Sequence, residues 1–448
     1  MKQHTVALAL AAGTLITTNV LAEDFDWRKF EGTEITWAYD IHPYADAVVA
    51  YLDEFEELTG IKVSPELYPD DTYWGKLNIQ LSSGSPDWDV VGTGVQPAWD
   101  VTPAGQLTPL RAFIEDPSMT NPEFDYEDFF PALRRAWTWN VEEENIIDTP
   151  DGEIWAIPHA FENVQLMYRT DILDRLGVEP PGTLPDLTAA CLQITKADPS
   201  ITPMAVRGVR FWSSIHTAPI SIARSYGVSD FVGSGDDLDT GLDSADSIRF
   251  HKDYVEMIQA CAPDSWANDN WYQVVDGLSS GKTAMAMDAN MFGFWNNIKG
   301  ASEASGKIAF APPLTAPGNA EFASNIFIWS LAINAASEKK GAAWYFTQWA
   351  TSKEMNVRGA TDGKLVNSPR TSTWQDQAWI DYAKQPEFNN FYDTFNTVQP
   401  KISLLFTPRY GFAIAMNAWA VAMQDMVGGD DVQERLSELA DDIREELE

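Results

Sequence analysis

Four short segments of the chain place aromatic residues beside polar ones, at 40–44, 96–99, 210–212 and 288–295. Carbohydrates have apolar C–H surfaces that are edged by hydroxyl groups. An aromatic ring can pack on such a surface while carboxylate, amide or guanidinium groups bond the hydroxyls. Many of the 18 tryptophans are expected in a core, but the four segments together favour a carbohydrate site.

Two motifs that are similar to catalytic loops overlap between Asp276 and Thr283. The first is close to a phosphate-binding loop, but Asp276 replaces its first glycine and a strand is expected after it instead of before it. The second is a Gly-x-Ser-x-Gly match at 277–281. Serine hydrolases with that motif need a later histidine, and the last histidine of this chain is His251. We interpret the segment as a turn before a buried strand and predict neither catalytic residues nor an enzyme.

No metal site or cofactor is predicted. No two of the five histidines have the spacing of metal ligands. The acidic loop 236–241 has a glycine where a calcium-binding EF-hand loop needs one, but ligand positions then fall on Leu238 and Thr240. Asp243 or Ser244 is a better candidate for the N-cap of a following helix.

The candidate segments follow predicted strands of a parallel sheet. An apolar strand at 35–38 precedes apolar residues with helical spacing at 48–58, and Gly60 ends that helix before a second strand. A strand, a helix and a strand with short connections form a parallel unit. Residues 89–91 form a third strand.

Ligands of such sheets bind beyond the carboxyl ends of the strands, which points to the segments after Trp37, after Val91 and around Glu162. A chain of 448 residues is too long for one ordinary core, so we expect two lobes. The chain has no internal repeat or linker, which favours lobes joined by crossings at a hinge. Further strands and helices are expected at 164–168, 171–176 with Thr170 as its cap, 185–195, up to 260, 284–287, 327–333, 339–350 and from 431 onward.

The composition is strongly acidic. Sixty-six acidic residues against 30 basic ones give a net charge of −36, spread along the chain. Such a protein repels nucleic acid and anionic lipid, so neither is an expected partner. We interpret the acidity as a solvated surface, with a saline habitat as a hypothesis.

The N-terminus has the pattern of a secretory signal peptide. Lys2 is followed by an apolar run from Val6 to Val20 and a predicted cleavage site after Ala22. Position 23 is Glu and not Cys, so no lipid anchor is expected, and no later run is apolar for long enough to span a membrane. We therefore expect an exported, periplasmic protein.

Export permits a disulfide between the two cysteines, Cys191 and Cys261. The sequence does not give the distance between their Cα atoms, so the bonded and unbonded states stay equally open.

Five motifs occur in the order found in one protein family, and their joint order over about 300 residues is specific although each motif is short. They are Phe55–Val63, Asp151–Pro158, Leu166–Asp171, Gly281–Met285 and Ala332–Ser337. In these motifs the chain resembles the extracellular (periplasmic) solute-binding proteins of ABC importers, a family that includes maltose-binding protein and binders of other sugars and polyols.

The resemblance implies an α/β fold with two lobes, each a mainly parallel sheet flanked by helices, around a cleft. Lobe 1 would contain residues 23–162 and about 311–352, and lobe 2 residues 163–310 and about 353–448. The predicted ligand contacts come from positions similar to family contacts and from the aromatic–polar segments, and they are Asp40, His42, Tyr44, Gln96, Glu162, Trp212, Asp288, Asn290, Trp295, Trp329, Arg409 and Tyr410.

The match departs from maltose-binding protein at Gly293, where that protein has a ligand tryptophan, and Trp295 lies two residues further on. This departure argues against maltose itself. Asp40 lies near an aligned position without matching it strictly.

We therefore expect a monomer that captures a sugar or sugar alcohol and delivers it to the permease of an ABC importer. A ligand that contacts both lobes would shift the protein toward a closed state. Two alternatives stay open. One is an exported carbohydrate-active enzyme, and the other is a binder of a cationic solute such as a polyamine, which aromatic and carboxylate groups also suit.

Overall fold

The computed structural model describes residues 25–141, 151–233 and 237–447, and the predicted signal peptide lies outside them. The described strands of the main sheet are, in chain order, β1 (Glu34–Asp40), β2 (Lys62–Tyr68), β3 (Val90–Thr93), β6 (Ile157–Arg169), β7 (Thr202–Ala205), β10 (Thr283–Ala289), β11 (Ile308–Ala311), β12 (Ser324–Ile333) and β13 (Ile402–Ser403). Their order is β2-β1-β3-β12-β6-β10-β7, with β11 paired to β6 and β13 to β12. Across these three stretches, no helix is both long and apolar enough to cross a bilayer.

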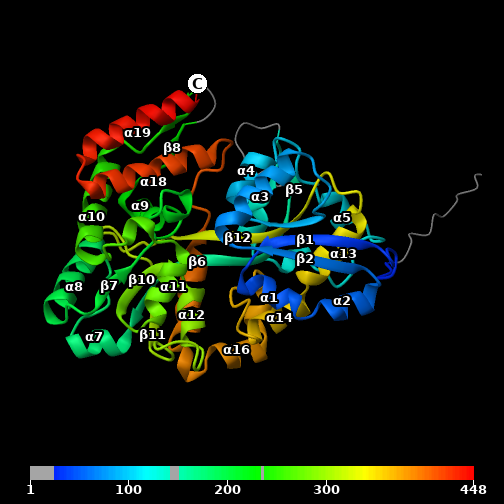
Figure 1. Ribbon diagram of the computed structural model, residues 1–448, viewed down its shortest axis with the longest axis horizontal. Helices are drawn as coiled ribbons and strands as arrows, with labels where there is room; N and C mark the ends of the chain where they lie inside the picture. The colour runs from blue at the N-terminus through cyan, green and yellow to red at the C-terminus, as the bar shows by residue number, and fades with distance from the viewer. Residues whose placement is uncertain (1–24, 142–150, 234–236, 448) are drawn as a thin grey trace, which may run out of the picture.

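The first three strands run parallel, as the strand–helix–strand pattern predicts. The helices around them are α1 (Pro43–Val49), α2 (Leu52–Thr59), α3 (Asp70–Ser82) and α4 (Val95–Val101). Figure 1 shows α3 and α4 on one face of these strands and α1 and α2 on the other. The single helix predicted at 48–58 is two helices, because Tyr51 leaves the helical conformation with φ −124° and ψ 12°. Gly60 ends α2 with a φ of 70°, as predicted.

Two long strands join the halves of the sheet. β12 lies between β3 and β6 and runs antiparallel to both. β6 pairs with β12 through its first half and with β10 and β11 through its second half. The strand predicted at 164–168 begins earlier, at Ile157. Its first half was not predicted, because Pro158, His159 and Glu162 interrupt the apolar pattern there.

The second half of the sheet is mixed, because β10 is antiparallel to β6 and parallel to β7. The helices here are α7 (Thr170–Leu176), α8 (Leu184–Ala197), α9 (Ala218–Tyr226), α10 (Ala245–Cys261), α11 (Trp271–Ser279) and α12 (Met291–Asn297). Cys191 and Cys261 form a disulfide between α8 and α10. Ser244 caps α10, as predicted. Thr170 is the first residue of α7 and not its cap, because its hydroxyl donates to the carbonyl of Lys307.

The C-terminal helices return to both halves of the molecule. They include α13 (Lys340–Ala350), α14 (Lys353–Thr361), α15 (Thr371–Gln375), α18 (Phe412–Gly428) and α19 (Val432–Leu447). α14 packs near α1 and α2, where Arg358 lies 2.6 Å from the carboxylate of Glu54. α18 and α19 pack against α10. The lobe boundary expected near residue 352 stays a prediction, and α14 contacts the first-lobe helices.

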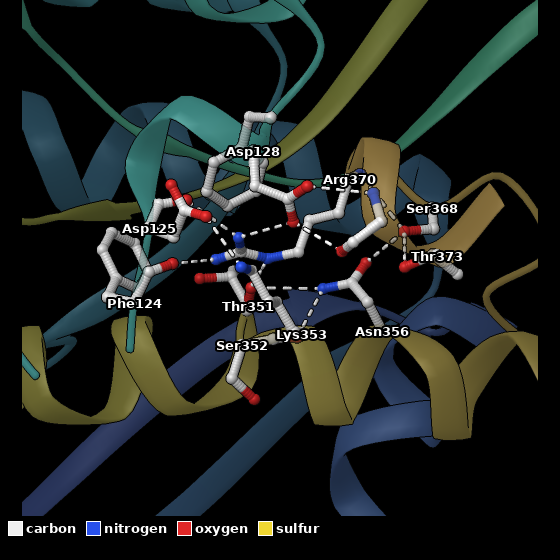
Figure 2. Close-up of polar contacts among 12 residues, drawn as sticks. Phe124, Asp125, Asp128, Thr351, Ser352, Lys353, Asn356, Ser368, Arg370 and Thr373 are labelled. Carbon is white, nitrogen blue, oxygen red and sulfur yellow. Dashed lines mark hydrogen bonds and ion pairs between the residues drawn. The ribbon is translucent and has the colours of Figure 1, made fainter. Parts of the chain in front are cut away.

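A buried arginine joins three separate segments (Figure 2). Arg370 donates to the carbonyl of Phe124 at 2.9 Å, to that of Thr351 at 2.6 Å and to the carboxylate of Asp128 at 3.2 Å. Its guanidinium also lies 4.0 Å from the ring centre of Phe129. Burial lowers the pKa of Arg370 to about 10, although Asp128 acts in the opposite direction. The cluster fixes the loop before α15 to the segments around 124–129 and 351.

Candidate ligand-binding site

A cavity lies between the two halves of the molecule. It encloses about 460 Å³ of space outside the protein atoms, part of which is open to solvent. Its lining comes from the ends of β1 and β2, from the shared strands β6 and β12, and from segments beyond β7 and β10. The lining residues are Asp40, His42, Asp70, Trp74, Glu162, Arg207, Phe211, Trp212, Ser213, His216, Asn270, Trp271, Phe292, Phe327 and Trp329.

The floor of the cavity is built on the two shared strands. Glu162 on β6 lies opposite Phe327 on β12, and the indole N–H of Trp329 donates to Oε1 of Glu162 at 2.9 Å. Glu162 is 7% exposed, and its burial raises the pKa of its carboxyl to about 7, although Arg207 and Trp329 act in the opposite direction. The carboxyl therefore titrates near neutral pH.

Arg207 follows β7 and is held from behind by Asp288 on β10. Nε and Nη2 of Arg207 donate to the two carboxylate oxygens of Asp288 at 2.8 and 2.7 Å, which is a bidentate pair. Nη1 donates to Nε2 of His216 at 3.1 Å, and Nη2 lies 3.9 Å from Oε2 of Glu162. Asp288 therefore fixes the plane of a guanidinium that faces the cavity.

Aromatic rings form the walls. Trp212 lies beside Phe327, with ring centroids 5.9 Å apart. Trp271 at the start of α11 stacks on Phe292 at 5.9 Å and also lies 5.9 Å from His42, which follows β1. Flat rings on several sides can pack against the C–H groups of a small ligand.

The side near β1 and β2 carries acceptors. Asp40 ends β1, and Asp70 begins α3 directly after β2. Arg207 is the one Lys or Arg among the described lining residues, against three carboxyl groups. Within the described chain, no group of three or more His, Cys, Asp or Glu is arranged to hold a metal ion.

The structure brings five of the predicted contacts together in the cavity lining, namely Asp40, His42, Glu162, Trp212 and Trp329. Tyr44 and Trp295 lie just behind His42, with ring centroids 4.3 and 5.5 Å from its imidazole, and do not line the cavity. Asp288 does not line it either and acts through Arg207.

Four other predicted contacts lie outside the lining. The amide of Gln96 donates to the carbonyl of Ile326 at 3.2 Å. Oδ1 of Asn290 accepts from the amides of Asn163 and Asn367, at 3.0 and 2.6 Å. The guanidinium of Arg409 lies 4.3 Å from the ring of Phe231, and Tyr410 is 66% exposed.

Sequence reasoning missed several lining residues. Arg207 and Asp70 each follow the carboxyl end of a strand, so the strand-end rule would have found both had β7 and the full length of β2 been predicted. Ser213 and His216 lie close to the predicted Trp212 in the sequence. They were not predicted, because only the aromatic residue was considered as a ligand contact. Asn270 and Trp271 carry no pattern that marks them as ligand contacts.

The sequence model of the family described as bacterial extracellular solute-binding protein matches residues 42–357. The chain belongs to this family. Among related solute-binding proteins, the erythritol/L-threitol-binding protein of Mycolicibacterium smegmatis is 32% identical over 417 residues, which cover 93% of this chain and 86% of that protein. A mannitol-binding protein of Pseudomonas aeruginosa is 26% identical over 310 residues, covering 67% and 65%.

Solved structures of solute-binding proteins confirm the two-lobed α/β fold. A maltose-bound MalE3 of T. maritima has a TM-score of 0.77 at 19% identity, covering 92% of this chain and 99% of that one. A ribitol complex of a solute-binding protein from Agrobacterium radiobacter K84 also has a TM-score of 0.77, at 18% identity, covering 92% and 98%.

Proposed function

We propose that this solute-binding protein captures a small sugar alcohol, of the four-carbon class that includes erythritol, for an ABC importer. The observation that carries the proposal is a cavity between the lobes that is lined by indole rings together with carboxyl, imidazole and guanidinium groups. Neutral polyols offer both C–H surface and hydroxyls to such a lining.

The relatives support the substrate class. The 32% identical relative over 93% of this chain is named for erythritol and L-threitol, and the 26% identical one for mannitol. All three of these ligands are open-chain polyols. Within the broader expectation of a sugar or sugar alcohol, we therefore favour an alditol.

Export and delivery belong to the same proposal. The predicted signal peptide at 1–22 would direct the protein to the periplasm, where closure of the lobes around the ligand would present it to a permease. The contact between His42 and Trp271 from opposite lobes supports a closed arrangement.

A cationic solute is the second candidate, because three carboxyl groups and one arginine line the cavity. Cation binding would weaken as salt is added, whereas binding of a neutral polyol would not. An exported enzyme is the third, and formation of product from the ligand would identify it.

A thermal-shift panel of the protein from residue 23 onward tests these candidates. The panel contains erythritol, L-threitol, mannitol, maltose and 1,4-diaminobutane. A ligand at a hundredfold excess over its Kd adds about 2.7 kcal/mol of stability. We expect the largest shift with a four-carbon alditol, confirmed by calorimetry at two salt concentrations and by recovery of unchanged ligand. A shift with the diamine alone would contradict the proposal.

A further inference from the structure

We propose that the two histidines of the cavity, His216 and His42, are fixed as opposite neutral tautomers that each direct an N–H group at a ligand hydroxyl. The site would then select hydroxyl groups over ammonium groups. This inference rests on the proposed function and adds to it how the protein recognises the hydroxyl groups of the ligand.

The tautomer of His216 is set by Arg207. Nη1 of Arg207 lies 3.1 Å from Nε2 of His216, and a guanidinium can only donate. Nε2 must therefore accept, and in the neutral ring the proton lies on Nδ1. That nitrogen is buried and has no hydrogen-bond partner among the described residues, although the side chain lines the cavity.

The alternative ring orientation of His216 does not remove this conclusion. Turning the ring by 180° would place a C–H group, and not a nitrogen, against Nη1 of Arg207. Asp288 holds that guanidinium through both carboxylate oxygens, so it cannot turn away without losing two charge-assisted hydrogen bonds.

The tautomer of His42 is set by the main chain. Nδ1 of His42 accepts the backbone N–H of Tyr44 at 3.2 Å, as the cap of α1. In the neutral ring the proton then lies on Nε2. His42 and His216 thus present opposite ring nitrogens as donors, from opposite lobes.

Both rings stay neutral because their surroundings oppose a charge. Burial lowers the pKa of His42 to about 3. Burial and the neighbouring Arg207 both lower the pKa of His216 well below its usual range. Arg207 and the rings of Phe327 and Trp212 face His216. The rings that face His42 are those of Tyr44, Trp271, Trp295 and Trp329, and His159 also disfavours a charge on His42.

This arrangement suits a hydroxyl and not a protonated amine. A hydroxyl accepts from a histidine N–H through a lone pair and donates its own proton to a carboxylate. Such acceptors line the same cavity in Asp40, Asp70 and Glu162. A protonated amine has no lone pair, so it would leave both histidine N–H groups without acceptors inside a buried site. The acidic lining alone would favour a cation, but the two donors oppose it.

Nitrogen-15 spectra of the histidine rings test the tautomers directly. His251 supplies an internal reference, because its Nε2 accepts the indole N–H of Trp419 at 2.8 Å and its Nδ1 lies 2.7 Å from the carbonyl of Ser247. We expect His216, assigned from the spectrum of His216→Asn, to show the Nδ1–H pattern of His251, and His42 to show the Nε2–H pattern. A proton on Nε2 of His216, or on both of its nitrogens, would overturn the inference.

Titration calorimetry with erythritol and 1,4-diaminobutane tests the role of His216 in ligand binding. We expect His216→Leu to weaken erythritol binding by roughly tenfold to a hundredfold, the range for a buried hydrogen bond lost. His216→Asn places an amide donor near the position of Nδ1 and should recover most of the loss. The diamine should not bind the wild-type protein. Equal erythritol affinity in His216→Leu and the wild type would refute the role of His216.

Failure of the proposed function can be distinguished from failure of the inference about the histidine tautomers. If erythritol, L-threitol and mannitol all fail to bind the wild-type protein, the proposed function falls and the donor role falls with it. If erythritol binds tightly and its addition leaves the ring resonances of His216 and His42 unmoved, the function stands and this inference alone fails.

Discussion

The imidazole of His42 and the indole of Trp271 lie with their centroids 5.9 Å apart, although one follows β1 and the other begins α11. His42 follows a strand of the first half of the sheet, Trp271 precedes a strand of the second half, and both residues line one cavity. A ligand enclosed there would contact both halves, so we expect its binding free energy to depend on closure.

Trp271→Ala should weaken erythritol binding by about 1–3 kcal/mol, the scale of a buried aromatic contact, because it removes both a ring against the ligand and the contact with His42. Titration calorimetry measures the change. The matched control is Tyr272→Ala, since Tyr272 is the next residue, is 38% exposed and does not line the cavity. Equal losses in the two variants would contradict the role of Trp271.

Glu162→Gln should change how stability depends on pH. The carboxyl has a pKa of about 7 in the folded protein against 4.5 when unfolded, so the folded state holds the proton more tightly. Its stabilising effect is fully present below pH 4.5 and is lost as the pH rises through 7. Relative to Glu162→Gln, the wild type should lose on the order of 3 kcal/mol over this window. Urea unfolding of both proteins from pH 4.5 to 8 checks this, and parallel curves would contradict it.

The disulfide should stabilise the second lobe. Cys191 and Cys261 are 70 residues apart, and closing a loop of that length removes chain entropy worth about 4 kcal/mol from the unfolded state. The double variant Cys191→Ala, Cys261→Ala should unfold at lower urea concentration. Reducing agent should lower the midpoint of the wild type and leave that of the double variant unchanged. A wild-type midpoint that reductant does not move would count against the bond.

Arg370→Met should destabilise the protein by roughly 3–5 kcal/mol, because it removes the charge partner of Asp128 and the donor to three carbonyls, those of Phe124, Asp125 and Thr351. Arg358→Met is the comparison. Arg358 pairs with the half-exposed Glu54, and such surface pairs contribute about 0–1 kcal/mol. Chemical unfolding measures both, and similar losses would show that burial of the cluster in Figure 2 does not matter.

The local pattern of the sequence predicted much of the fold. Helical spacing and Gly60 placed α2, and the parallel pairing of β1 with β2 and β3 followed from the short connections. The pattern failed at β6, because Pro158, His159 and the cavity residue Glu162 interrupt its apolar run. Strand pairing between β12 and β3 depends on residues far apart in the chain, which local periodicity does not report.

Only part of the candidate site could be predicted, because it too depends on residues far apart in the chain. Residues at strand ends, such as Asp40 and Glu162, were found from topology and resemblance, and they line the cavity. Arg207 was missed because β7, the strand that it follows, was not predicted. Its partners Asp288 and His216 come within hydrogen-bonding distance only in the folded chain.

The position of β12 has a consequence for the order in which the chain folds. β12 fills the gap between β3 and β6, and the amide of Gln96 bonds the carbonyl of Ile326, 230 residues further along. A chain that emerges from its N-terminus therefore cannot complete its first sheet until β12 is available. Contacts of such long sequence separation slow folding, because the loop must close before they form. The first half of the sheet therefore stays incomplete for most of the synthesis of the chain, which would suit the export proposed above.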